Sequence, residues 1–512
     1  MSAINKYISG LKMKCFEMPN ATYTSRFIAL TIFKSHRQQY LALIFFLISI
    51  IAIPLQVVAQ HSSGQDSLLI VNSITYTGNK KTKDRIIARE IMFVEGDTLS
   101  RDKFYKLLEK SRKNLLNTSL FNFVTTDLQI HSEEADYVDV IFNFTERWYI
   151  WPWPIVEFAD RNFNVWWNEN RDLSRLSYGV LIKWDNFTGR KDKLEVTTRF
   201  GYNELYGLEY SIPYVNRKET IGLGVGAGYG RAHEVPVINM DNELVYYEDD
   251  QDYVMHSVVS YLSLIYRKEI YNTHTFRLEY NYRDYADTLI DINPGFIPNG
   301  QTKLQYLSFV YQYKSDFRDC KPYPLNGHYF DIELVKRGFN LLDNGSMDVF
   351  YILTTFRKYW RLGKRWYFAS GLNSKFSNDE QQPFYMEGAV GYGRDIIRGY
   401  EYYVVNGQNF GIFKNNFKFA LLPEREFEIN FIGSEKFSRV HYAFYLNAFF
   451  DMGFVDNMYT MPELNNDLEN TLLIGYGIGL DFVTYYDIVL RFEYSVNRMG
   501  EHGFYLHFRA PI

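Results

Sequence analysis

From about residue 153 to the C-terminus, the chain repeats segments of roughly ten residues in which apolar and polar positions alternate. One such segment alternates the apolar residues Phe276, Leu278, Tyr280 and Tyr282 with Arg277, Glu279, Asn281 and Arg283. A period of two residues predicts β-strands with one apolar and one polar face. We expect about sixteen strands, an even number as in bacterial transmembrane barrels. They begin near residues 153, 176, 192, 205, 218, 252, 273, 303, 327, 346, 364, 408, 440, 473, 487 and 503.

The composition bears on the choice between a membrane barrel and a soluble β-protein, which also alternates apolar and polar residues. The 512 residues include 43 Tyr and 41 Phe, and the apolar faces are rich in these aromatic side chains. Aromatic residues form interfacial girdles in membrane barrels, and a water-filled lumen accommodates charges on the opposite faces. We therefore expect an antiparallel membrane barrel over residues 149–512. A soluble secreted β-protein is the more distant alternative.

Net charge and cysteine content argue against two other kinds of protein. The formal net charge of -5 is too mild to indicate binding to nucleic acid. The chain has two cysteines, Cys15 and Cys320. If the N-terminus is removed, one cysteine is left. Neither a disulfide framework nor a cysteine-based metal site is then expected within one chain.

Five glycines recur at every second position, at residues 222, 224, 226, 228 and 230. They do not match the G-x-G-x-x-G spacing of a phosphate-binding loop. In a strand all five lie on one face, where we expect them to leave room in the lumen for an inserted loop.

The long apolar run at residues 41–58 follows basic residues at 34–37 and precedes Ala59. This pattern predicts a secretory signal peptide cleaved after Ala59. A transmembrane anchor is the alternative, because the run is nearly long enough to span a membrane. The stretch before the run is long for a signal peptide, so Met13 or Met18 is a candidate start. We assign residues 1–59 to the N-terminal extension and signal peptide, and 60–67 to a linker.

Residues 68–148 show the pattern of a compact α/β module. Turn signals at Gly78-Asn79 and Gly96-Asp97 separate its elements. We expect a strand at 69–76, a helix at 82–91 capped by Thr82, a helix capped by Ser100, and strands at 121–130 and 137–145. The expected order is β-α-α-β-β.

This order resembles a POTRA domain, the periplasmic module of the BamA/TamA superfamily of outer-membrane assembly and translocation barrels. The matching positions are Gly78-Asn79, Thr82, Ile86-Ile87, Arg89-Glu90, Gly96-Asp97, Leu115 and Leu120-Phe121. The resemblance implies a sheet edge to which an extended client adds through main-chain hydrogen bonds, largely regardless of its side chains. A small α/β domain of unknown use is the alternative.

A long loop rich in glycine and aromatic residues separates the eleventh and twelfth expected strands. Its segment Ile397-Arg398-Gly399-Tyr400 resembles the tip of the sixth extracellular loop of the same superfamily, which folds back into the barrel. Gly399 allows the backbone to turn close to the barrel wall. An arginine in a narrow lumen loses hydration and needs a bidentate carboxylate. A surface arginine on a flexible loop is the alternative.

The resemblance also implies the partner of Arg398. The superfamily carries an acid on strand thirteen in a Phe-x-Asp-x-Gly pattern, which Phe449-Phe450-Asp451-Met452-Gly453 matches. By alternation, Asp451 shares a face with Asn447 and Tyr445, whereas Leu446, Ala448 and Phe450 face lipid. We expect Arg398 to pair with Asp451.

Two departures from the superfamily pattern stand beside one further match. A second acid, usual on strand twelve, is replaced by Asn416 in the stretch Asn416-Phe417-Lys418-Phe419. Outer-membrane barrels often end in an aromatic residue, whereas this chain ends Phe508-Arg509-Ala510-Pro511-Ile512, with Phe508 as the candidate equivalent. The further match is Asp316-Phe317-Arg318-Asp319, followed by Pro322, Pro324 and Gly327.

The first expected strand opens with Trp151-Pro152-Trp153-Pro154. Each proline lacks a main-chain donor. A seam between the first and last strands with fewer hydrogen bonds could open sideways and accept a client strand. The alternative is a stiff linker between domain and barrel.

Taken together, these features predict an outer-membrane protein of a Gram-negative bacterium, with one POTRA-like domain in the periplasm. The resemblance implies assistance in protein insertion, assembly or translocation. Its partners would be outer-membrane lipid, unfolded outer-membrane or secreted clients, and other assembly factors. No nucleophile–base pair, metal cluster or phosphate loop stands out in the sequence, so we expect neither an enzyme nor a cofactor. A passive channel or structural barrel is the alternative. Two-partner secretion is a further option, although that group usually carries two POTRA domains.

Overall fold

The computed structural model describes residues 68–132, 136–158, 173–297, 300–339, 341–342, 347–378, 382–393, 395–429, 432–484, 486 and 488–507. The predicted signal peptide, its cleavage point, the linker at 60–67 and Phe508 lie outside the described residues. Within the described ranges, every helix is too short or too polar to cross a membrane.

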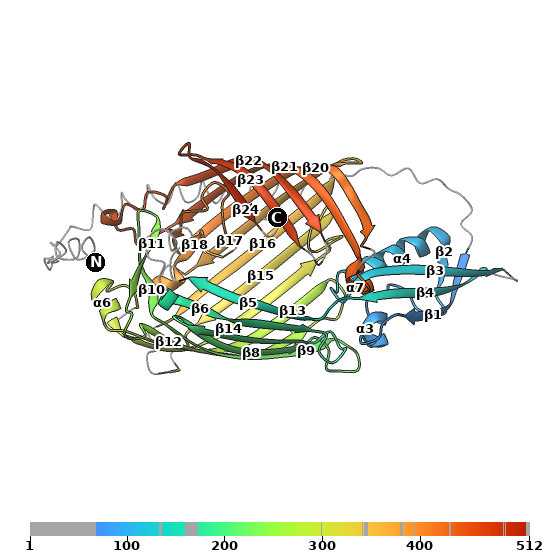
Figure 1. The fold of residues 1–512 in the computed structure, drawn as a ribbon, viewed down its shortest axis with the longest axis horizontal. Helices are drawn as coiled ribbons and strands as arrows, with labels where there is room; N and C mark the ends of the chain where they lie inside the picture. The colour runs from blue at the N-terminus through green and yellow to red at the C-terminus, as the bar shows by residue number, and fades with distance from the viewer. Residues whose placement is uncertain are drawn as a thin grey trace. The chain divides into compact units, whose positions relative to one another are not determined.

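The POTRA-like domain consists of two helices on a four-stranded sheet (Figure 1). Its elements are β1 (Leu68–Thr77), α3 (Asp84–Ala88), β2 (Thr98–Ser100), α4 (Arg101–Leu116), β3 (Phe121–Ser132) and β4 (Asp136–Glu146). The sheet order is β2-β1-β4-β3, with β1 and β4 parallel and the other pairs antiparallel. The core forms because α4 buries Phe104, Leu108 and Leu115 against the alternate apolar residues of β4.

The predicted cap of α4 is confirmed, whereas the helix predicted at 82–91 is wrong in its extent. The Ser100 hydroxyl accepts a hydrogen bond from the Lys103 N–H. The first helix, α3, is shorter than predicted, and Lys83 occupies its N-cap position. Thr82 is buried, and its hydroxyl lies within hydrogen-bond distance of Tyr149 (3.1 Å) and Asn186 (2.9 Å). The strand β2 was not predicted, because its three residues are too few to show a period.

Sixteen antiparallel strands form the second part of the chain, here called the barrel sheet. Each begins within three residues of its predicted start, and the predicted fold class is confirmed. The strands are β5 (Ile150–Phe158), β6 (Leu176–Asp185), β7 (Lys193–Gly201), β8 (Glu204–Ile212), β9 (Ile221–Ala232), β12 (Met255–Tyr266), β13 (Asn272–Tyr285), β14 (Lys303–Asp316), β15 (Gly327–Arg337), β16 (Val349–Arg361), β17 (Trp366–Ser377), β20 (Asn409–Glu428), β21 (Arg439–Asp456), β22 (Leu472–Thr484), β23 (Val489–Asn497) and β24 (His502–His507).

The connections between these strands carry the remaining short elements. Strands β10 (Glu234–Met240) and β11 (Glu243–Glu248) form a separate hairpin, and β18 (Gly388–Val390) pairs with β19 (Val405–Asn406). The short helices are α6 (Thr288–Ile292), α7 (Glu435–Ser438), and the 3-10 turns η2 (Leu173–Arg175), η4 (Phe384–Met386) and η5 (Pro462–Leu464).

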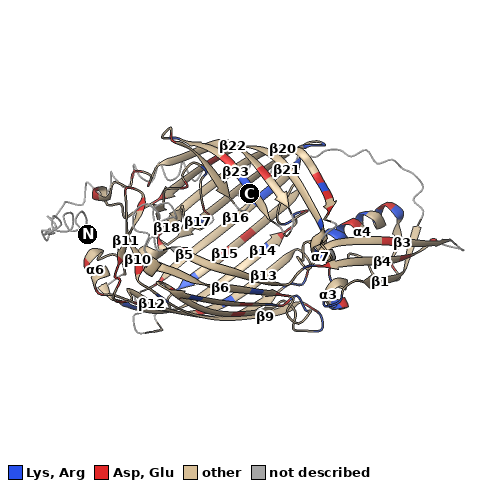
Figure 2. Ribbon diagram, viewed as in Figure 1, with Lys and Arg blue, Asp and Glu red and all other residues tan. Residues whose placement is uncertain are grey.

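The two faces of the barrel sheet differ in polarity as the alternation predicted. In β21, Tyr445, Asn447 and Asp451 are buried, whereas Leu446 and Phe450 are exposed. Figure 2 shows charged positions in the otherwise tan strands β20 to β23. Among them, Lys418, Asp451, Asp481, Arg491 and Glu493 are buried inside the curled sheet. The apolar residues of the same strands therefore form the outer surface.

Side chains of the neighbouring strand β12 lie close to several of the alternate glycines of β9. Gly222, Gly224, Gly226 and Gly230 are buried, while the alternate residues Leu223 and Val225 are exposed. A Cβ at Gly226 would lie 2.4 Å from the Tyr261 ring of β12. Side chains of β12 also lie close to Gly224 and Gly230, so the prediction of room for an inserted loop is wrong at these three positions.

The barrel sheet begins with β5 and ends with β24. Within the described ranges, no ladder joins these two strands. Pro152 and Pro154 lie inside β5, opposite Ile182 and Val180 of β6, so the alternative of a stiff linker is wrong. The Trp151 ring packs edge-on against Tyr486, in the turn between β22 and β23, at 4.8 Å between centroids.

Candidate functional site

The tip of the loop between β17 and β20 is held against the inner face of the barrel sheet. This Arg398 loop spans residues 378–408, of which 379–381 and 394 lie outside the described residues. Three glycines make the close approach possible. Gly399 has φ +95 and packs against Asn497, and a Cβ at Gly475 would lie 1.7 Å from the Arg398 carbonyl oxygen. A Cβ at Gly453 would lie 2.2 Å from Cδ1 of Ile397.

Arg398 and Asp451 form a bidentate ion pair. Arg398 Nε donates to Asp451 Oδ2 at 2.7 Å, and Nη2 donates to Oδ1 at 2.5 Å. The Arg398 main-chain N–H also donates to Oδ2 at 3.3 Å. The two side chains are 1% and 0% exposed, so both charges are removed from water and depend on each other.

The residues around this pair provide partners for the remaining N–H donors and for the face of the Arg398 guanidinium. Its centre lies 3.9 Å from the centroid of the Phe449 ring, which places a cation over an aromatic face. Nη1 donates to Asn416 Oδ1 at 2.7 Å, and Nη2 donates to the Asn415 carbonyl at 3.5 Å. Asn416, which stands where the resemblance implies an acid, therefore contacts Arg398 through a neutral amide oxygen.

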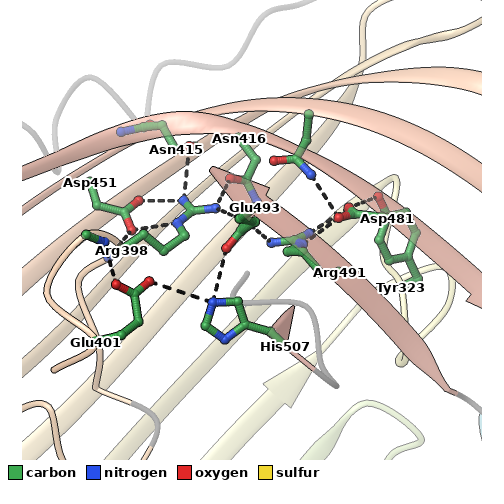
Figure 3. A network of polar contacts seen from close by, with 12 residues as sticks. Tyr323, Arg398, Glu401, Asn415, Asn416, Asp451, Asp481, Arg491, Glu493 and His507 are labelled. Carbon is green, nitrogen blue, oxygen red and sulfur yellow. Dashed lines mark hydrogen bonds and ion pairs between the residues drawn. The ribbon is translucent and has the colours of Figure 1, made fainter. Parts of the chain in front are cut away.

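A second carboxylate comes from β23, a strand that the sequence predicted but did not link to Arg398. Glu493 on β23 is fully buried, and its Oε1 lies 3.3 Å from Arg398 Nη1 (Figure 3). The same Oε1 lies 3.5 Å from Nη1 of Arg491. In the sequence, Glu493 alternates with the apolar residues Phe492 and Tyr494, which is typical of a polar strand face, but this local pattern identifies no partner for it.

The polar network continues from Glu493 in two directions (Figure 3). Arg491 donates twice to Asp481, at 2.5 and 2.6 Å, and Asp481 also accepts from the Tyr323 hydroxyl at 2.6 Å. On the other side, His507 Nε2 of β24 lies 3.3 Å from Glu493 Oε2 and 3.7 Å from Glu401 Oε1. Glu401 in turn accepts a hydrogen bond from the Gly399 N–H at 2.8 Å. The network thus joins the loop tip to β20, β21, β22, β23 and the last strand.

Other residues that the sequence analysis identified make their contacts away from Arg398. Lys418 is buried, and its Nζ lies 4.4 Å from the centroid of the Tyr323 ring. Asp319 shapes the connection between β14 and β15 by accepting from the main-chain N–H groups of Cys320 and Leu325. Gly327, with φ +110, begins β15.

The POTRA signature residues shape that domain. Gly78 has φ +84, and a Cβ there would lie 2.2 Å from the Phe144 carbonyl oxygen, so the turn requires glycine. Asn79 donates to the Thr82 carbonyl and to Asp84. Gly96 has φ +89. Leu120 and Phe121 are buried in the domain core.

A further arginine–carboxylate pair, Arg267–Glu90, joins the POTRA-like domain to turns of the barrel sheet. Glu90 is 2% exposed, and Arg267, between β12 and β13, donates to its two oxygens at 2.7 and 3.1 Å. The neighbouring Arg89 donates to the main-chain carbonyls of Glu219 and Arg267. Burial alone would raise the pKa of Glu90, but Lys191 and Arg267 lower it to about 2.

Comparison with known proteins matches both parts of the chain. Residues 69–147 match the family model POTRA, described as "Surface antigen variable number repeat". A curated relative, "Putative outer membrane protein assembly factor" of Treponema pallidum (strain Nichols), is 29% identical over 133 residues. That match covers 26% of this chain and only 14% of the relative.

Similar solved structures include BamA from Haemophilus ducreyi lacking POTRA domains 1–3, with 16% identity and a TM-score of 0.46. The match covers 86% of this chain and 83% of that one. CdiB from Acinetobacter baumannii has 13% identity and a TM-score of 0.46, over 86% and 74% of the two chains. The family model confirms the predicted POTRA domain. The curated relative confirms, over the matched segment, the predicted resemblance to outer-membrane assembly proteins.

Proposed function

We propose that this protein is an outer-membrane barrel that assists the insertion or assembly of outer-membrane proteins, or the translocation of polypeptides. Its POTRA domain would lie in the periplasm and receive unfolded clients, and the protein would act without catalysing a reaction. The observation that carries the proposal is a POTRA domain with an open sheet edge, followed directly by a sixteen-stranded antiparallel sheet.

The open edge is β3, the outermost strand of the sheet order β2-β1-β4-β3. It is 12 residues long, whereas β2 at the other edge has 3 residues. Thr125, Asp127 and Gln129 of β3 are exposed. An extended peptide can add to such an edge through main-chain hydrogen bonds, which every client offers whatever its side chains. An edge of this length suits a module that must hold many different unfolded chains.

The Arg398 loop supports the proposal from inside the barrel sheet. Its tip occupies space beside β20 to β23 and is fixed there by buried charges. Removal of that arginine would leave carboxylates buried and unpaired. We therefore infer that the loop stabilises the strands near the end of the sheet while clients are handled.

The first test is depletion of the protein, followed by quantitative proteomics of the outer membrane and the growth medium. Selective loss of other barrels, or of one exported protein, is expected and would name the clients. An unchanged proteome with altered uptake of small solutes would overturn the proposal in favour of a passive channel.

A second test addresses the edge directly. A photo-crosslinking residue in place of Gln129 should capture extended client segments, because it lies on β3. The matched control is the same residue in place of Lys106, which is exposed on α4 of the same domain. Equal capture at both positions would show that β3 is not the receiving edge.

A further inference from the structure

A polar cavity lies where the POTRA domain meets the turns of the barrel sheet. Its volume is about 230 Å³. Four cationic and two acidic side chains are among its lining residues: Lys191, Arg267, Lys314, Lys321, Glu90 and Asp316. The cavity therefore carries an excess of positive charge.

The two acids are already paired, which leaves the lysines without a full counter-charge. Arg267 holds Glu90, and Arg318 binds Asp316 through two hydrogen bonds of 2.8 Å. Lys191 Nζ lies 3.9 Å from Glu90 Oε1, beyond hydrogen-bond distance. Among the contacts of the described residues, none places a carboxylate within 4.0 Å of Nζ in Lys314 or Lys321. Like charges held close together in a concave site repel one another unless an anion joins them.

The backbone at Lys191 gives a second reason to regard the cavity as a built site. Lys191 has φ 61, in the left-handed region that side chains other than glycine and asparagine rarely adopt. Its N–H donates to Asn186 Oδ1 at 2.9 Å, and the turn is further held by Asp192, which accepts from Thr188 N–H at 2.8 Å. Such backbone strain persists only where the surroundings impose it, and it is common at ligand sites.

The electrostatics of Lys191 agree with this geometry. Burial, together with Arg267, Lys321 and Arg89, lowers its pKa to about 7 against the opposing effect of Glu90. An anion in the cavity would favour the charged ammonium and relieve this repulsion.

We propose that the cavity binds a phosphate group, either that of a phospholipid headgroup or free phosphate. A phosphate carries more than one negative charge and several strong acceptor oxygens, so one group can contact Lys191 and Lys321 together. Arg267 adds positive charge while its donors remain on Glu90. The site is independent of the assembly role proposed above, because it rests on the charges of this cavity alone.

The test uses the full-length protein purified in a phosphate-free, non-ionic detergent. Isothermal titration with inorganic phosphate measures binding of the free anion, and native mass spectrometry measures retained phospholipid. The variant Lys191→Gln with Lys321→Gln should lower phosphate affinity or phospholipid occupancy at least about tenfold, because each lost ammonium removes a charge-assisted hydrogen bond. The control Lys103→Gln with Lys106→Gln changes the net charge of the protein equally at exposed positions of α4, and it should bind normally.

The two arms identify the source of the phosphate. Retained phospholipid in the wild type that is absent from the double variant would assign the site to lipid. Titratable phosphate without retained lipid would assign it to the free anion. A further variant, Lys191→Arg with Lys321→Arg, keeps both charges and should retain binding, which separates a lost site from a misfolded one. Absence of both ligands from the wild type would overturn the proposal, as would equal binding by the Gln double variant.

Discussion

Two arginine–carboxylate pairs, Arg398–Asp451 and Arg267–Glu90, differ in the charges that surround them. Around Arg398, the cations of Arg398 and Arg491 face the carboxylates of Asp451, Asp481 and Glu493. Around Glu90, several cations surround a carboxylate that Arg267 already occupies. A network in which each cation has a carboxylate partner fixes one arrangement of the chain, whereas a surplus of cations leaves capacity for a ligand. The first pair therefore acts as a clamp, and the second borders a binding site.

The largest effect should come from breaking the network around Arg398. Arg398→Ala leaves Asp451 and Glu493 buried without their common cation, which should lower the free energy of unfolding by about 3–5 kcal/mol. Urea unfolding in detergent micelles, followed by tryptophan fluorescence, measures this loss. Arg361→Ala, at an exposed position of β16, is the matched control and should change stability little. Equal stability of the Arg398→Ala protein and wild type would show that the pair is not a clamp.

The second pair should respond to acid. Because the folded pKa of Glu90 is about 2, below its usual 4.5, its stabilisation is present above about pH 4.5 and is lost as the pH falls toward 2. That shift corresponds to roughly 3 kcal/mol. Limited proteolysis near residues 148–150 should accelerate between pH 5 and pH 3, and Glu90→Gln should be cut quickly at both values. Acid-insensitive proteolysis of the wild type would contradict this account.

A smaller loss of stability should follow removal of the second carboxylate, and it tests whether another strand can supply that charge to Arg398. Glu493→Gln should destabilise the barrel sheet by about 1–3 kcal/mol, because Arg398 and Arg491 lose a shared acceptor charge. Asn416→Glu in the same protein returns a carboxylate to Arg398 from β20, and it should recover most of the loss. The comparison is made by urea unfolding of the single and double variants. Failure of the second change to recover any stability would mean that Glu493 acts mainly through Arg491.

The smallest effect concerns the last strand. His507 is partly exposed, so His507→Ala should cost less than about 1 kcal/mol in global stability. It should nevertheless speed hydrogen exchange of the β24 amides, because the contacts to Glu493 and Glu401 are lost. His502→Ala, on the same strand but outside the network, serves as the control. Unchanged exchange in β24 would show that His507 does not hold the strand to the loop.

The sequence predicted those parts of the fold that depend on local periodicity. All sixteen strands were located because apolar–polar alternation is written within each segment, and the same alternation placed Asp451 on the buried face. The extent of α3 was missed, because Thr82 is engaged by Tyr149 and Asn186 rather than by the helix. The Tyr261 ring over Gly226 was missed for a similar reason, since cross-strand neighbours depend on register.

In the candidate site too, the sequence indicated some residues and could not indicate those that depend on tertiary contacts. The resemblance of the loop tip and of strand thirteen indicated Arg398 and Asp451, which the structure brings together. Glu493, Arg491 and His507 belong to strands that meet the loop only when the sheet has curled, so no local pattern links them to Arg398. The cavity beside Glu90 could not be predicted from any local pattern, because its lysines come from separate turns and strands.

The position of the clamp along the chain has a consequence for the order in which the protein itself is built. Arg398 is made before its partners Asp451 and Glu493, which lie 53 and 95 residues further along. The loop therefore lacks the residues that hold its tip until β21, β22 and β23 have joined the sheet. We therefore expect docking of the loop to follow the assembly of these C-terminal strands. A chain truncated before β23 would keep its Arg398 loop undocked, which gives the cell a structural difference between finished and unfinished copies.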